Sequence, residues 1–230
     1  MEIFKDMWEQ SYARNENYIF FPKEEVVKFL NRFVRKKIGL NQFIDKLDFS
    51  QTVRGLDMGC GIGSNTLLMG EFGLEAYGVD ISANAIHAAQ EIARATNREH
   101  VASRFCVVEG DRMPFPDGYF DITICDSVLD SMSFSLAQQN TKEISRVTKK
   151  YAFLTIISGD DSEHFREYDG EEIVSGTHEN GTVQSYFNFE KIKRLILDTN
   201  FKIVWCHLVQ DLSLLDANVG SRYFLVLEKE

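Results

Sequence analysis

The chain has 230 residues, of which 44% are hydrophobic and 26% charged, and its formal net charge is −10. This composition is ordinary for a globular protein, and the length fits one large domain that folds without disulfides or a structural metal. The negative charge disfavours nucleic-acid binding, which needs a basic face. No apolar stretch has the length of a membrane span or a signal peptide, so we expect a cytoplasmic protein with no membrane partner.

The cysteines give no sign of a metal site. Cys60, Cys106, Cys125 and Cys206 form no Cys-x-x-Cys pair. Short zinc motifs are built from such pairs, so we expect no metal. Buried free thiols in a reducing compartment account for all four residues.

Residues 1–49 are expected to form an N-terminal helical cap. Apolar residues recur at helical spacing from Pro22 to Lys37, and residues 41–49 read as a short connecting turn of helix. The aromatic residues Trp8 and Tyr12 either pack onto the sheet or close over a ligand. A basic cluster lies at the end of the predicted helix, where the helix dipole favours cations, and we prefer this interpretation to a phosphate-binding patch; its members are Arg32, Arg35, Lys36 and Lys37.

A glycine-rich turn between a predicted strand and a predicted helix is the most informative motif. It reads Leu56-Asp57-Met58-Gly59-Cys60-Gly61-Ile62-Gly63. Glycine lets the backbone approach a ligand closely, and the helix that follows offers unpaired N–H groups. A tight turn without a ligand is the alternative. We expect a nucleotide-like cofactor to lie across this turn.

The turn differs from the dinucleotide fingerprint in two ways. Its spacing is Gly-x-Gly-x-Gly rather than Gly-x-Gly-x-x-Gly, and Asp57 stands two residues before the first glycine. A carboxylate at that position would repel a pyrophosphate but suits a cofactor that carries an ammonium or a sulfonium. The pattern therefore favours S-adenosylmethionine, and an NAD-dependent oxidoreductase is the alternative.

Strands and helices alternate through the first two thirds of the chain. Strands are predicted at 53–58, 74–79, 104–109, 120–125 and 151–157, and helices at 64–72, 82–95 and 135–149. Such alternation predicts a parallel sheet with helices on both faces. Asp80 and Asp111 follow two of these strands, at the edge where ligands bind in open α/β sheets. Asp80 either accepts hydrogen bonds from ribose hydroxyls or caps the next helix, and we favour binding.

The pattern changes after Ser158. A polar stretch is predicted to contain a hairpin of 171–178 and 181–187 around Glu179-Asn180-Gly181. A helix at 189–199 and strands at 202–209 and 222–228 follow. We therefore expect one domain over residues 1–230, in which the cap precedes three further parts: a cofactor-binding half at 50–158, a substrate-side insert at 159–187 and a C-terminal helix with strands at 188–230.

These motifs resemble the class I S-adenosylmethionine-dependent methyltransferases. The resemblance rests on Leu56 to Gly63, Gly78 to Ser82, Gly110 to Asp111 and Met113 to Asp121. It implies an α/β fold with a Rossmann-like, doubly wound, seven-stranded sheet that is mostly parallel with one antiparallel strand. It also implies S-adenosylmethionine as methyl donor, S-adenosylhomocysteine as product and a small-molecule acceptor, with the enzyme acting as a monomer or homodimer.

The resemblance also implies a role for each matching residue. The glycine turn lines the methionine and ribose portions, with Asp57 orienting the amino group; this group comprises Asp57, Gly59, Cys60, Gly61 and Gly63. The ribose and adenine are assigned to Asp80, Ile81, Asp111, Arg112 and Met113, and Asp126 and Ser127 lie between methyl donor and acceptor. In the N-terminal segment, Tyr12 is a candidate for closing over the methionine end and Arg14 for pairing with the cofactor carboxylate.

The acceptor side departs from the family in one respect. Many small-molecule members have a histidine soon after the fourth strand, where this chain has Asp130. The candidate catalytic residues are therefore Asp126, Asp130 and His178. One of them would act as general base if the acceptor is a hydroxyl.

The sequence leaves two hypotheses about the reaction open. The run from Trp8 and Tyr12 to Phe21-Pro22-Lys23 is similar to methyltransferases of bacterial surface-polysaccharide pathways, which implies a sugar or sugar-nucleotide hydroxyl as acceptor. The alternative from another class is a protein that binds the cofactor without turnover.

Overall fold

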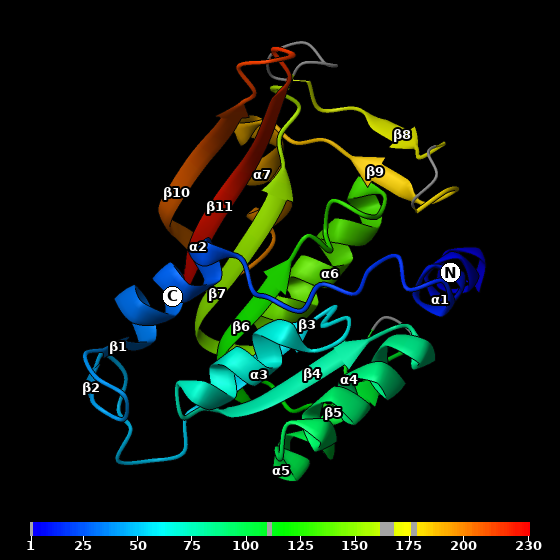
Figure 1. Ribbon diagram of the computed structural model, residues 1–230. Helices are drawn as coiled ribbons and strands as arrows, with labels where there is room; N and C mark the ends of the chain where they lie inside the picture. The colour runs from blue at the N-terminus through cyan, green and yellow to red at the C-terminus, as the bar shows by residue number, and fades with distance from the viewer. Residues whose placement is uncertain (1, 110–111, 162–167, 176–178) are drawn as a thin grey trace.

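The computed structural model describes residues 2–109, 112–161, 168–175 and 179–230. Its centre is a seven-stranded sheet in the order β10-β11-β7-β6-β3-β4-β5 (Figure 1). The strands are β3 (Arg54–Met58), β4 (Glu75–Asp80), β5 (Phe105–Val107), β6 (Phe120–Asp126), β7 (Thr148–Ile157), β10 (Phe201–Leu212) and β11 (Val219–Lys229). The predicted α/β sheet is therefore present, with each predicted strand within a few residues of its expected place.

One strand of this sheet runs against the others. β3 pairs in parallel with β4 and β6, β4 with β5, and β6 with β7. β11 lies between β7 and β10 and is antiparallel to both. The expected Rossmann-like arrangement, mostly parallel with one antiparallel strand, is confirmed.

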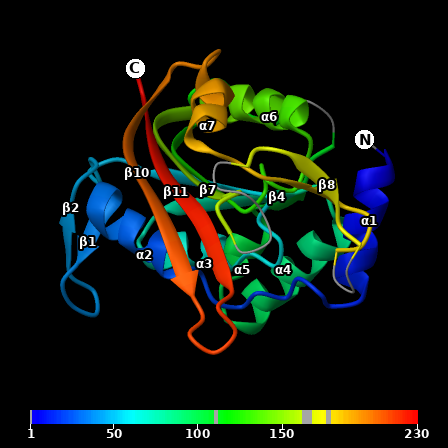
Figure 2. The ribbon, with the colours of Figure 1, turned by 90° about the horizontal axis from the view of Figure 1, so that it is seen from above.

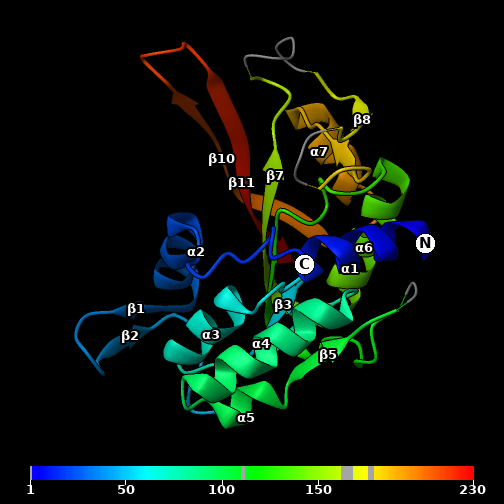
Figure 3. The ribbon, with the colours of Figure 1, turned by 45° about the vertical axis from the view of Figure 1, so that its right-hand side comes forward.

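Helices cover both faces because successive side chains of each strand point to opposite sides. In β7, Phe153 packs with residues of α2 (Glu24–Phe29) and α3 (Ser64–Glu71) in one core cluster. Its neighbours Ala152, Leu154 and Ile156 pack with residues of α6 (Phe134–Val147) and α7 (Phe189–Ile196) in another. α4 (Ala83–Ala95) and the short α5 (Glu99–Ala102) lie near α3, as Figure 3 shows.

The N-terminal cap is only partly as predicted. α1 (Glu2–Ala13) lies beside α4, and α2 continues as one wide turn over Leu30–Val34. The chain then forms an antiparallel hairpin of β1 (Arg35–Lys37) and β2 (Phe43–Asp45), at the opposite end of the molecule from α1 (Figure 2). The predictions of helix through Lys37 and at 41–49 were wrong.

Tertiary contacts of Arg35 explain this hairpin. Its guanidinium lies 4.4 Å from the ring centroid of Phe43 and 3.7 Å from that of Phe49, and it pairs with Asp45 at 2.6 Å. Stacking and pairing of this kind favour the extended backbone over another helical turn. Three members of the basic cluster thus lie on β1 rather than at a helix end.

The insert contains the predicted hairpin in shortened form. β8 (Glu171–Ile173) pairs antiparallel with β9 (Val183–Ser185). Glu179 and Gly181 both have positive φ, 55° and 88°, as a tight reversal requires. None of the helices in the described ranges combines the length and apolar character needed to cross a bilayer.

Candidate functional site

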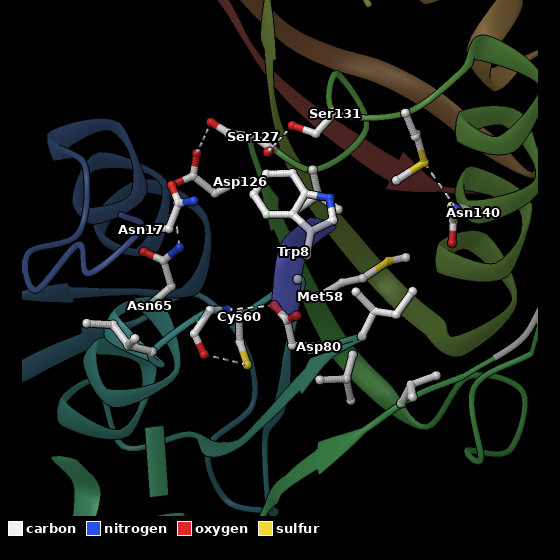
Figure 4. A pocket seen from close by; sticks show the side chains of 18 of the residues that line it. Trp8, Asn17, Met58, Cys60, Asn65, Asp80, Asp126, Ser127, Ser131 and Asn140 are labelled. Atoms are coloured by element: carbon white, nitrogen blue, oxygen red, sulfur yellow. Dashed lines mark hydrogen bonds between the residues drawn. The ribbon is translucent and has the colours of Figure 1, made fainter. Parts of the chain in front are cut away.

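A cavity of about 330 Å³ lies beyond the carboxyl ends of β3, β4 and β6. Its walls come from segments far apart in the chain (Figure 4). They include Trp8, Tyr12, Phe21, Lys23, Gly59, Cys60, Gly61, Asn65, Asp80, Ile81, Arg112, Met113, Asp126, Ser127, Asn140, Glu143 and Glu179. A volume of this size is typical of a small-molecule site.

The backbone of the glycine turn forms one wall of the cavity. Gly59 and Gly61 have φ of 68° and 52°, which L residues rarely adopt. A Cβ on Gly59 would meet Val128 Cγ2 at 2.3 Å, and one on Gly61 would meet Tyr12 Oη at 2.6 Å. Gly63 does not line the cavity; a Cβ there would meet the Phe105 ring at 2.5 Å, so this glycine serves the packing of α3 on the sheet.

Asp80 is fixed at the edge of the cavity. Its Oδ2 accepts a hydrogen bond from the Gly61 N–H at 2.9 Å and its Oδ1 one from the Ser82 N–H at 2.9 Å. Burial raises the pKa of this carboxyl group, and the backbone N–H groups partly offset that effect. Each oxygen keeps a lone pair for a ligand hydroxyl. The capping of α4 falls to Ser82, whose Oγ accepts from the Ala85 N–H.

Helix α6 holds Met113, which lines the cavity near Ile81. Met113 is buried, and its N–H donates to Glu143 Oε1 of α6 at 2.6 Å. Arg146 Nη2 donates to the same oxygen at 2.6 Å. Glu143 could not be predicted from the sequence, since no local pattern connects it to a loop 30 residues away. Asp111 lies outside the described residues.

Asp57 lies beneath the glycine turn rather than in the cavity. It is 1% exposed, does not line the cavity, and accepts a hydrogen bond from Thr66 Oγ1 at 2.7 Å. Burial raises its pKa to about 7, and the negative charge of Asp126 acts in the same direction. Asp57 thus ties the turn to α3 and does not face the cavity, so its expected role in orienting the amino group, directly or through water, stays a prediction.

Asp126 and Ser127 line the cavity at the end of β6, and Lys23 holds both of them. Lys23 Nζ donates to Asp126 Oδ1 and to Ser127 Oγ. Thr155 Oγ1 also donates to Asp126 Oδ1. Burial alone would raise the pKa of Asp126, but Lys23 and these hydrogen bonds outweigh it, so the pKa is below its ordinary value. Asp126 is therefore an anion at neutral pH.

Asp130 does not reach the cavity. It is 1% exposed, and its Oδ2 accepts from the Ile157 N–H at 2.7 Å and from Arg222 Nη1 at 2.8 Å. These bonds tie the loop after β6 to β7 and β11. The expectation that Asp130 acts as a base is corrected accordingly, and His178 lies outside the described residues.

The N-terminal segment supplies Trp8 and Tyr12 to the cavity but not Arg14. Arg14 is exposed, and its guanidinium pairs with Glu16 at 2.6 Å. The expected pairing of Arg14 with a cofactor carboxylate is therefore not supported. Lys23 and Asn65 line the cavity and were missed; the only local signals are a lysine within an aromatic segment and an amide just after the third glycine.

Comparison with known proteins agrees with this geometry. A family described as "Methyltransferase domain" matches residues 56–156, from β3 to β7. The match covers 101 of the 230 residues, and over this stretch the chain is similar to methyltransferases. An oxidoreductase is not favoured.

Individual methyltransferases resemble this chain over limited stretches. Tocopherol O-methyltransferase of Arabidopsis thaliana is 26% identical over 125 residues, which are 50% of this chain and 36% of that protein. Sterol 4-C-methyltransferase strm-1 of Caenorhabditis elegans is 33% identical over 107 residues, 46% of this chain and 30% of that protein. The alignments thus span about a third of the length of these curated relatives.

A solved structure extends the likeness over the whole fold. The 1,6-didemethyltoxoflavin-N1-methyltransferase of Burkholderia thailandensis, with bound 1,6-didemethyltoxoflavin and S-adenosylhomocysteine, superposes with a TM-score of 0.68 over 99% of this chain and 88% of that one. At 14% identity this likeness shows the fold alone. The names of these three methyltransferases point to oxygen, carbon and nitrogen acceptors, so the similarity leaves the acceptor atom open.

Proposed function

We propose that the cavity binds S-adenosylmethionine and that the chain transfers its methyl group to a small molecule. The observation that carries this proposal is the meeting of three features around one cavity: the backbone of Gly59 to Gly61, the fixed carboxylate of Asp80 and the anionic Asp126. A positively charged ligand with a sugar suits this arrangement, whereas a pyrophosphate would face two carboxylates.

The residues present fit the cofactor in further ways. Ile81 and Met113 offer apolar surface to an adenine ring, and Asp80 offers acceptor lone pairs to ribose hydroxyls. Trp8 lines the same cavity, where an aromatic face would stabilise a sulfonium by about 0.5–2 kcal/mol. The bound cofactor would supply an electrophilic methyl carbon and a neutral thioether leaving group.

The chain contributes to the reaction by holding the methyl donor and the acceptor in the right orientation. Orientation of reacting groups alone supplies up to about 7–11 kcal/mol. Among the described residues that line the cavity there is no histidine, and Asp126 Oδ1 already accepts from Lys23 and Thr155. This arrangement favours an acceptor whose lone pair reacts once it is held in line and shielded from water.

The cavity also bears on the class of acceptor. Ile19, Phe21, Val128, Met132 and Leu136 line it together with the polar groups. Such a lining favours an acceptor with an apolar portion, and a sugar hydroxyl stays the second hypothesis on the basis of the N-terminal resemblance.

Methyl transfer from a donor with a deuterated methyl group tests the proposal. The protein is incubated with this donor and a deproteinised metabolite extract, and mass spectrometry identifies labelled small molecules. We expect at least one labelled product, lost in Asp80→Ala. Donor binding without any labelled product would favour a binding protein without turnover.

A further inference from the structure

The outward face of the β1–β2 hairpin carries large aliphatic side chains at positions open to solvent. Lys36 of β1 lies directly opposite Ile44 of β2, so both side chains lie on the same face. Ile38 follows on that face, because its N–H continues the ladder by donating to the Gln42 carbonyl at 2.9 Å. Ile38 is 53% exposed, Ile44 48% and Leu40, in the turn between the strands, 90%. With Lys46, two residues beyond Ile44, they make up a surface that we call the hairpin face: Lys36, Ile38, Leu40, Ile44 and Lys46.

The opposite face of the hairpin is the one that packs onto the core. Phe43 lies against the core cluster, and its ring centroid is 6.0 Å from that of Phe72. Arg35 lies over the Phe43 ring and pairs with Asp45 at 2.6 Å. These contacts hold the hairpin in place without help from the aliphatic side chains of the hairpin face.

This end of the molecule is basic although the chain as a whole is acidic. Residues 30–49 include five basic and two acidic residues, whereas the whole chain has a net charge of −10. Both acids are engaged locally, Asp45 with Arg35 and Asp48 with Ser50. The exposed basic side chains of this segment are Arg32, Lys36, Lys37 and Lys46. An anionic surface is therefore attracted to the hairpin and repelled by the rest of the molecule.

The size and chemistry of the hairpin face indicate its partner. Five residues are far fewer than the roughly 20–30 that each partner contributes to a stable protein interface. A nucleic-acid surface offers phosphates to the lysines but nothing to three aliphatic side chains. A bilayer with anionic headgroups suits both components, because the aliphatic side chains enter the interfacial region while the lysines stay among the headgroups.

We propose that the hairpin face docks the protein on anionic lipid bilayers, with Leu40 inserted below the headgroups. Figures 1 and 3 show the β1–β2 hairpin projecting from the body of the fold. None of the residues of the hairpin face lines the cavity, so the docking surface is separate from the proposed methyl-transfer site. The expectation of no membrane partner rested on the lack of a spanning segment, and docking of this kind needs none.

Co-sedimentation with lipid vesicles tests this proposal. Vesicles of phosphatidylserine and phosphatidylcholine in equal parts are compared with vesicles of phosphatidylcholine alone. We expect the full chain to bind the anionic vesicles and not the neutral ones. Lys36→Gln/Lys46→Gln should weaken this binding about ten- to thirtyfold, because each lysine near an anionic surface contributes about fivefold. Leu40→Ser should weaken it about tenfold, because insertion of the apolar side chain is lost.

Matched variants separate docking through this face from general attraction. Lys142→Gln/Lys193→Gln removes two half-exposed lysines of α6 and α7, with the same change in net charge. Leu215→Ser removes a fully exposed leucine between β10 and β11. We expect both controls to bind the anionic vesicles as the wild type does. All four variants change exposed side chains, so they should unfold at the wild-type temperature.

Three results would overturn the proposal. One is the lack of any preference for anionic vesicles, which includes no binding at all. Another is equal weakening in the hairpin variants and in their controls. The third is unchanged binding in Leu40→Ser, which would mean adsorption by charge without insertion. Binding to a short RNA duplex but not to vesicles would likewise overturn it and assign the basic end to nucleic acid.

Discussion

Three carboxyl groups at the ends of neighbouring strands have different environments in this molecule. Asp57 is buried below the turn with one hydroxyl donor, Asp80 is held by two backbone N–H groups, and Asp126 is paired with Lys23. From the sequence, all three were predicted to belong to the cofactor site. Their hydrogen-bond partners show that the first supports the turn and the other two face the cavity.

The raised pKa of Asp57 makes a prediction about stability. Burial raises this pKa to about 7 from an ordinary value near 3.8, so the folded protein binds the proton more tightly than the unfolded chain. The contribution of the group to stability is therefore complete below about pH 4 and is lost as the pH rises through 7. We expect the free energy of unfolding of the wild type to fall between pH 4 and 8, relative to Asp57→Asn, by at most about 4 kcal/mol. Urea unfolding across this range measures the difference, and parallel curves would contradict the prediction.

Two glycines of the same region should respond oppositely to alanine. Gly59 has positive φ and no room for a Cβ, so Gly59→Ala should destabilise the fold by about 1–3 kcal/mol and abolish cofactor binding. Gly70 lies in helix α3, where an added methyl group would meet Val101 Cγ2 at 3.9 Å, an ordinary van der Waals distance. Gly70→Ala should therefore stabilise the protein by about 0.4–1 kcal/mol. Equal effects of the two substitutions in denaturant unfolding would contradict this account.

At the scale of elements, Glu9 fastens α1 to the start of α4. Its carboxylate accepts hydrogen bonds from the N–H groups of Ala83 and Asn84, at 2.6 and 3.0 Å, and from Ser82 Oγ at 2.8 Å. The first N–H groups of a helix have no partner inside it, and a carboxylate is favoured there by the helix dipole. This contact places Trp8 and Tyr12 over the cavity.

Removal of the Glu9 carboxylate should loosen the N-terminal helix. In Glu9→Ala we expect the amide protons of residues 5–13 to exchange roughly tenfold faster, because the charge-assisted bonds to α4 are lost. Glu91→Ala, which removes an exposed acid of α4 itself, is the control and should leave that exchange unchanged. Hydrogen exchange followed by mass spectrometry measures both, and unchanged protection in Glu9→Ala would show that α1 is held by other contacts.

Element boundaries were predictable where local signals decide them. α4 begins after its Ser82 cap and α6 after Ser133, both within a residue of the predicted starts. The β1–β2 hairpin was not predictable, because Arg35 finds Phe49 and Asp45 only in the folded chain. Lys23 was missed for the same reason, since its partner Asp126 is 103 residues away.

At the scale of the whole molecule, the strand order brings the predicted residues together. β3 lies between β4 and β6, so the glycine turn, Asp80 and Asp126 meet at one edge although they span 68 residues of sequence from Gly59 to Asp126. Alternation of strands and helices predicted this edge. It did not predict which residues of the N-terminal segment would cover it, because that depends on the docking of α1.

The central claim is that this edge binds an adenosyl cofactor, and thermal unfolding with ligands tests it most directly. A ligand at 100 times its Kd stabilises a protein by about 2.7 kcal/mol, which for a domain of this size is a rise in melting temperature of roughly 5–10 °C. We predict such a rise with S-adenosylhomocysteine and none with NAD. A rise with NAD and none with S-adenosylhomocysteine would contradict the claim.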